Sequence, residues 1–286
     1  MLENCSLTAR PSDNRAMHEA SDLGLFGPSS VTWRVHSEPC TLIGGLRALL
    51  IQALHPVAMA AVSQHSDYRT DPWGRFRRTS DYLVTTVFGS TEQAQASARK
   101  VRAVHRRVSG FDGVTGRWYR ADDPDLLLWV HAVQVDSFLT AYRRYAARLD
   151  DREADRYVRE MVLAAELLGL AAEDVPATLD DLKAYLQGMD PVLCLTPAAK
   201  EGMRYVLSPP LPLPARPLWA LASASAVALL PPRVRSLYGL RWAPLADAPL
   251  RVSTFGIFKA MRLLLPPPPP VRSAYARARA IQAQAA

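Results

Sequence analysis

The sequence lacks the short motifs that mark several common enzyme classes. It contains no GxGxxG, P-loop, HExxH or GxSxG segment, so it gives no support for a dinucleotide-binding fold, a P-loop nucleotide site, a zinc protease or an α/β-hydrolase. Its three cysteines, Cys5, Cys40 and Cys194, are widely spaced and form no CxxC pair. Such a set provides neither a metal knuckle nor a disulfide framework. It suits a reducing compartment, and we therefore expect a cytoplasmic protein.

Long apolar runs are also scarce. The N-terminal stretch MLENCSLTARPSDNRAMHEAS is polar and carries no apolar core of a signal peptide. The longest uncharged apolar stretch runs from Pro217 to Pro232 and is interrupted by Ser223 and Ser225. It falls short of the roughly 20 residues that a membrane-spanning helix needs. We expect a buried core helix there and no transmembrane segment.

Helix-forming residues dominate what the sequence does contain. Only 14 of the 286 residues are glycine, β-branched residues are sparse, and Ala, Leu and Arg are the prevailing types. Because 49% of the residues are hydrophobic, the chain can bury a substantial core. These observations predict an all-α fold built as a single large helical domain.

Positive charge is in excess, with 34 Lys and Arg against 27 Asp and Glu and a net charge of +7. Such an excess is compatible with nucleic acid, an anionic membrane surface or an acidic ligand. The arginines are spread over the predicted helices, and neither zinc-finger spacing nor an RNA-binding aromatic motif accompanies them. We therefore expect no nucleic-acid partner. Arginines that bind the carboxylates of a cofactor would explain part of the excess equally well.

Turn and cap residues divide the chain into three parts. We expect a flexible arm over residues 1–27, an all-α domain over residues 28–265, and a proline-rich extended spacer with a basic tail over residues 266–286. The segment FDGVTGRWYRADDP is predicted to be a turn-rich connection with room for a short hairpin. Cap and proline signals predict helices over residues 42–54, 56–64, 75–88, 91–109, 124–148, 153–168, 179–188, 218–230 and 253–265.

One cluster of candidate functional residues lies in KVRAVHRRVSG, residues 100–110. Arg102 and His105 are three residues apart, so they share a helical face. A histidine that projects from a helix into an apolar cavity can bind iron through one ring nitrogen, and a nearby arginine can pair with a haem propionate. By local pattern alone, a packed or surface histidine is the commoner outcome.

A second cluster lies in GRFRRTSDY, residues 74–82. Arg75, Arg78 and Thr79 are spaced at i, i+3 and i+4, which directs two guanidiniums and a hydroxyl the same way on a helix. Such a set could polarise dioxygen or hold carboxylates through bidentate hydrogen bonds. The alternative interpretation is a solvated basic face.

Four segments in order resemble the catalytic region of the latex-clearing protein / MpaB-type oxygenase family. They are IQALHPVAMAAVSQHSDY, DPWGRFRRTSDYL, VFGSTEQAQASARKVRAVHRRVSG and YRADDPDLLLWVHAVQVDSFLTAY. The resemblance covers about residues 30–190. It implies an all-α fold that encloses haem b, with His105 as the proximal iron ligand and Arg102 beside it. It also implies that Arg75, Arg78 and Thr79 form the distal set, with dioxygen and a small molecule as substrates.

Two departures from the rubber-cleaving members lie in these segments. Arg78 stands where those enzymes have a lysine, and Ser109 stands where they have an arginine. The distal glutamate proposed as their base has no evident counterpart. These departures argue against rubber-type alkene cleavage and leave haem binding in place.

The other histidines have plain structural interpretations beside functional ones. His131 is a candidate core histidine, although the resemblance makes it a candidate cofactor-pocket residue because the WVH element belongs to the family pattern. His55 precedes a proline at a helix break and is either a helix cap or a further cofactor contact. Without haem, His55, His65, His105 and His131 with Asp67 or Asp71 would be the pool for a non-haem metal site, although their spacing matches no standard motif.

The leading hypothesis is therefore a haem-b-dependent oxygenase that acts on an apolar or aromatic small molecule. The first alternative is a haem- or lipophile-binding protein of the same fold without turnover. The second is a structural or membrane-surface protein that uses its basic charge and its proline-rich C-terminal third.

Overall fold

The computed structural model describes residues 22–285, and most of the predicted N-terminal arm lies outside these residues. The prediction of an all-α fold is confirmed, since the described residues form thirteen α-helices and one two-stranded hairpin. The α-helices are α2 (Val31–His36), α3 (Thr41–Gln52), α4 (Pro56–His65), α5 (Pro72–Phe88), α6 (Thr91–His105), α7 (Pro124–Tyr145), α8 (Asp151–Leu168), α9 (Leu179–Gly188), α10 (Pro197–Leu207), α11 (Arg216–Ala228), α12 (Pro232–Leu237), α13 (Asp247–Leu264) and α14 (Pro269–Ala285). The strands are β1 (Ser109–Asp112) and β2 (Arg117–Arg120).

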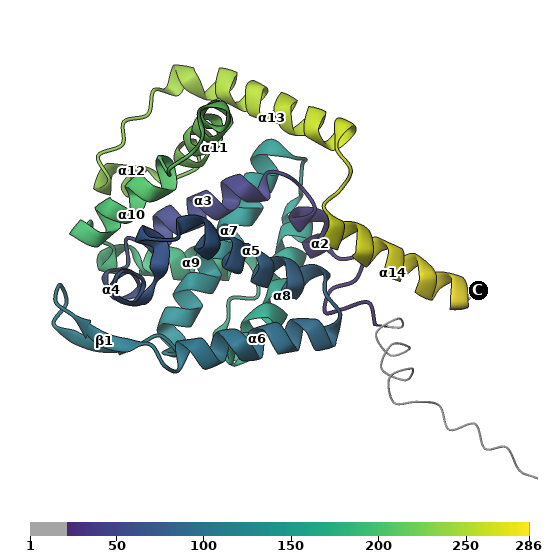
Figure 1. Cartoon of the computed structure of the whole chain (residues 1–286), viewed down its shortest axis with the longest axis horizontal. Coiled ribbons are helices and arrows are strands. Elements are labelled where there is room, and N and C mark those ends of the chain that lie inside the picture. The colour runs from purple at the N-terminus through teal and green to yellow at the C-terminus, as the bar shows by residue number, and fades with distance from the viewer. Residues whose placement is uncertain (1–21, 286) are drawn as a thin grey trace, which may run out of the picture.

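Helices α3 and α7 pack against each other at the centre of the molecule, and α8 and α11 cover them (Figure 1). Gly44 permits the close approach of α3, because a Cβ atom there would lie 2.7 Å from a ring carbon of Phe138 on α7. The same contact contains a buried charge. The guanidinium of Arg47, on a residue only 4% exposed, pairs with Asp136 at 2.7 Å and donates to Ser137 Oγ and to the Leu229 carbonyl.

Four helices, α4, α6, α7 and α9, begin at the residue that the sequence predicts. Ser90 caps α6, and its side chain and that of Gln93 form a reciprocal capping box. Asp123 caps α7, and Pro124 occupies the first turn, where its missing N–H costs nothing. Helix α8 ends at Gly169, which has a φ of 100° and therefore adopts the left-handed conformation that favours glycine.

Several expectations about helix bounds are wrong. The helix expected from residue 253 begins six residues earlier, at Asp247. The helix expected to reach Ser109 ends at His105, because residues 109–112 pair antiparallel with residues 117–120. The helix expected to continue to residue 148 ends at Tyr145. The extended spacer is shorter than the five prolines, since Pro269 begins helix α14.

Both ends of the described chain dock on the α5–α6 region. Asp22 accepts hydrogen bonds from the backbone N–H and the hydroxyl of Thr91. At the other end, α14 buries Val271 and Ala274 against a cluster that contains Trp33 and Phe88. Neither contact has a signal in the local sequence.

Within residues 22–285, no single helix is both long and apolar enough to cross a membrane. The pair α3 and α4 would pass on length and composition, but it is bent by 105°.

Candidate functional site

The predicted site residues concentrate on the hairpin formed by α5 and α6. The two helices are joined only by Gly89 and Ser90 and pack against each other (Figure 1). Since they run in opposite directions, the start of α5 and the end of α6 lie at the same end of the hairpin. Arg75 and His105 are therefore both at the end away from the connection.

His105, the last residue of α6, has a buried Nδ1 atom that has no hydrogen-bond partner among the described residues. Burial lowers the pKa of its imidazole, and the negative charge of Asp122 partly offsets that effect. The ring is therefore neutral near pH 7 and keeps a nitrogen lone pair for a ligand bond. A buried polar atom without a partner is uncommon in native proteins and calls for an explanation.

Two further unpaired atoms lie on α5, the buried hydroxyls of Tyr82 and Thr86. Of the five unpaired buried side-chain polar atoms found among residues 22–285, three therefore belong to α5 and α6. Burial raises the pKa of Tyr82, while Thr86 and Arg102 lower it, so these three side chains are close although the two hydroxyls form no hydrogen bond of good geometry. Sequence reasoning missed both residues. The available signal was their spacing, seven and eleven residues after Arg75 on the same helical stripe.

The cations of the hairpin differ in their partners. Arg75 is half-buried, has no ion-pair partner in the described part of the chain, and lies 5.9 Å from the Tyr68 ring centroid. Burial lowers its pKa, with the Tyr68 phenol opposing and the Arg78 charge reinforcing that effect. Arg102 is also half-buried and without an acidic partner between residues 22 and 285. A desolvated guanidinium without a carboxylate favours an anionic ligand.

Arg78 and Thr79 are placed differently from Arg75. Arg78 is exposed and held by two carboxylates, Asp67 at 3.5 Å and Asp71 at 3.3 Å. The hydroxyl of Thr79 is exposed and donates to the Arg75 carbonyl at 3.1 Å. The structure therefore brings only Arg75 of this predicted trio into a partly buried position.

His131 and His55 lie outside the hairpin. His131 is buried on α7, and burial lowers its pKa to about 4, which makes it a neutral core histidine. His55 caps α4, because its Nδ1 accepts a hydrogen bond from the Ala58 N–H at 3.3 Å, and its ring lies 5.8 Å from that of Trp129. This bond places the proton of neutral His55 on Nε2, so neither nitrogen offers a free lone pair.

No group of three or more His, Cys, Asp or Glu side chains in the described ranges is arranged to hold a metal ion, so the non-haem pool is not assembled.

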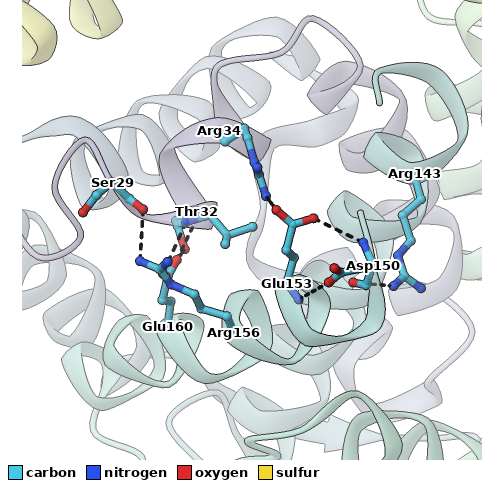
Figure 2. A network of polar contacts seen from close by, with 9 residues as sticks. Ser29, Thr32, Arg34, Arg143, Asp150, Glu153, Arg156 and Glu160 are labelled. Carbon is cyan, nitrogen blue, oxygen red and sulfur yellow. Dashed lines mark hydrogen bonds and ion pairs between the residues drawn. The ribbon is translucent and has the colours of Figure 1, made fainter. Parts of the chain in front are cut away.

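A polar network between α2 and α8 provides a contrast (Figure 2). Arg34 pairs with Glu153 at 2.6 Å, and Arg156 pairs with Glu160, whose carboxylate also accepts from the N–H of Thr32. Arg34, Glu153 and Arg156 line a cavity of about 400 Å³, and both of these arginines have a carboxylate partner. In this network, unlike the α5–α6 hairpin, the arginines that line the cavity are paired within the described part of the chain.

Comparison with known proteins places these observations in a family. The sequence model of the family described as "ER-bound oxygenase mpaB/B'/Rubber oxygenase, catalytic domain" matches residues 33–262. The chain belongs to this family. The match contains the whole α5–α6 hairpin and ends inside α13. Among curated proteins, no sequence shows significant similarity to the chain.

The fold of this MpaB/rubber-oxygenase member is similar to that of a solved protein. The structure entitled "Structure of Latex Clearing Protein LCP in the closed state" superimposes with a TM-score of 0.60. The alignment covers 98% of this chain and 80% of that protein, at 17% sequence identity. At this identity the likeness concerns the fold.

Proposed function

We propose that the chain is a haem-b-dependent oxygenase that acts on an apolar or aromatic small molecule, with His105 as the proximal iron ligand. The observation that carries the proposal is the set of unpaired groups on the α5–α6 hairpin. Three buried polar atoms without partners lie along this hairpin, and two of its half-buried arginines have no carboxylate partner within residues 22–285. A dianionic, polar-edged cofactor would satisfy both deficiencies at once, and the chain belongs to a family of oxygenases.

His105 would hold the iron through one ring nitrogen. Burial keeps the imidazole neutral, which is the protonation state that a metal ligand requires. The other nitrogen of such a ligand normally donates to a fixed acceptor that orients the ring. When bound, haem supplies the redox chemistry that activates dioxygen, while the protein sets access and orientation.

The two unpaired arginines have distinct roles in this proposal. Arg102, one turn before His105, would pair with a propionate, since a guanidinium binds a carboxylate through two parallel hydrogen bonds. Arg75 would supply positive charge and hydrogen-bond donors on the distal side. Arg78 and Thr79 would line the entrance to that side, and Arg78 must leave Asp67 and Asp71 to reach a bound molecule.

An aromatic cluster at the start of α5 supports an apolar or aromatic substrate. Trp73 packs edge-on against Trp219 of α11 with ring centroids 5.4 Å apart, and Phe76 lies 6.5 Å from Trp219. Trp73 and Phe76 are close to Arg75 in the sequence, while the Arg75 guanidinium itself lies over the ring of Tyr68. Apolar walls with a few polar groups are typical of small-molecule sites.

The ultraviolet-visible spectrum of the purified protein tests the proposal. We expect a Soret band that is lost or shifted in His105→Ala and unchanged in His65→Ala, because His65 is exposed. A colourless wild-type protein that also fails to take up added haemin would refute haem dependence.

The restraint on Arg78 also favours a second candidate, a haem- or lipophile-binding protein without turnover. If Asp67 and Asp71 keep the Arg78 guanidinium away from the distal side, one positive charge fewer is available there to interact with a bound molecule. Dioxygen consumption by the haem-loaded protein with apolar substrates separates the two functions. Turnover supports the oxygenase, and stable haem binding without turnover supports the binding protein.

A further inference from the structure

Helix α13 is apolar on two sides. Its inner side contacts the body through Thr254, which is 1% exposed, Phe258, which is 8% exposed, and the partly buried Met261. A stripe on the outer side carries Val252, which is 71% exposed, and Leu263, which is 75% exposed. Leu264, the last residue of the helix, is 81% exposed and lies next to this stripe. The residues that share the stripe, at spacings of three or four, are Pro249, Val252, Gly256, Ala260 and Leu263, and all are exposed.

An ordinary surface helix turns one apolar stripe toward the core and a polar face outward, whereas α13 is apolar on both sides. Figure 1 shows α13 at the outer edge of the molecule, beyond α11. The apolar surface continues past the helix through Leu265, which is 56% exposed, into the proline run. An exposed, continuous apolar surface of this kind marks a contact site.

Cations follow one edge of the stripe. Arg251, Lys259 and Arg262 are spaced at i, i+8 and i+11, with the half-exposed Phe255 between the first two. In the described part of the chain, Arg251 and Lys259 have no acidic partner, while Arg262 pairs with Glu38 at 2.8 Å and stays 48% exposed. Residues 248–286 contain six Lys and Arg and no Asp or Glu, so the edge has no opposing charge along the chain.

The positive charge along the edge of α13 indicates what kind of partner binds to this surface. In a dimer built on two copies of α13, two cationic edges with no acidic residue in this segment would meet, and like charges would oppose association. An anionic bilayer matches both features, because its acyl region accepts apolar side chains and its headgroups attract Lys and Arg. We propose that α13 docks the protein on an anionic membrane surface, lying in the headgroup region with its apolar stripe toward the lipid. This inference does not depend on haem or on catalysis.

Flotation with lipid vesicles tests this proposal on the full-length protein. Vesicles of phosphatidylcholine alone are compared with vesicles that also contain phosphatidylglycerol, at low and high salt. We expect binding to the anionic vesicles that weakens with salt, and little binding to the neutral ones. The double variant Arg251→Gln/Lys259→Gln should bind about 25-fold more weakly, from about 1 kcal/mol per cation near the surface.

The apolar stripe is tested by Val252→Ser/Leu263→Ser, which should bind anionic vesicles at least about tenfold more weakly. Both side chains are exposed, so the core is untouched, and circular dichroism checks the fold. The matched control is Trp118→Ser on β2, since Trp118 is 81% exposed and Figure 1 places the hairpin on the side away from α13. This control should bind like the wild-type protein.

Three results would overturn the proposal. The first is a wild-type protein that does not bind anionic vesicles. The second is vesicle binding that survives both α13 double variants, or that disappears in Trp118→Ser instead. The third is a dimer in sedimentation equilibrium that the α13 variants convert to monomer without any vesicle binding, which would make this face a contact between two copies of the chain.

Discussion

Removing Asp136 should destabilise the protein far more than removing a surface carboxylate. Its partner Arg47 has a side chain only 5% exposed, and Asp136 supplies the one negative charge in the contact at 2.7 Å. The variant Asp136→Ala leaves a buried guanidinium with two neutral acceptors, Ser137 Oγ at 2.6 Å and the Leu229 carbonyl at 2.9 Å. Breaking a buried pair on one side costs about 3–5 kcal/mol. Because the neutral acceptors remain, we expect Asp136→Ala to lower the free energy of unfolding by about 3 kcal/mol, the lower end of this range.

The measurement is urea unfolding followed by circular dichroism, with midpoints and slopes compared among variants. The matched control is Asp180→Ala, because the Asp180 side chain is 94% exposed in its pair with Lys183. Exposed pairs contribute about 0–1 kcal/mol. The double variant Arg47→Met/Asp136→Leu should lose less than Asp136→Ala, since no uncompensated charge remains. Equal losses for Asp136→Ala and Asp180→Ala would refute the reasoning.

Three further predictions follow from single positions. Burial lowers the pKa of His36 from 6.5 to about 4. Between these two pH values the unfolded chain binds a proton that the folded chain does not. The free energy of unfolding should therefore fall by about 1.4 kcal/mol per pH unit as the pH decreases from 6.5 to 4. Urea unfolding should show a smaller pH slope for His36→Gln, and an unchanged slope would contradict this. Gly44→Val should overpack the contact between α3 and α7, lower the free energy of unfolding by about 1–3 kcal/mol or more, and so lower the thermal midpoint. Gly45→Ala should leave the midpoint unchanged, because no atom lies within 4 Å of a Cβ at that position. Arg102→Gln should weaken haem binding about tenfold or more in spectral titration, because it removes a charged hydrogen bond to a propionate that contributes about 1.5–3 kcal/mol. Arg99→Gln on the exposed side of the same helix should leave the affinity unchanged, and equal affinities for the two variants would count against Arg102 as the propionate partner.

The all-α fold follows from short-range signals in the sequence. The Ser90–Gln93 capping box, the Asp123–Pro124 start and the proline at position 56 each act within about one helical turn, so they can be recognised without knowing the fold. The same locality puts Arg102 and His105 on one face of one helix. The resemblance to the oxygenase family likewise rests on segments that a linear sequence displays, and the family match confirms it.

Contacts between distant segments decide the rest. Helix α6 stops at His105 because the next residues pair with β2, and α14 forms from Pro269 because its buried face meets Trp33, more than 200 residues earlier.

The sequence by itself determined an all-helical chain with a histidine and arginines placed on the α5–α6 hairpin. Only the tertiary structure decided which polar atoms of this hairpin are buried without a partner among the described residues, as at His105, Tyr82 and Thr86, and that α13 leaves a second apolar stripe exposed on the side away from the core. The physical reason is that hydrogen bonds within a helix and its caps involve residues at most five positions apart, whereas burial and charge pairing depend on every segment that packs against a residue.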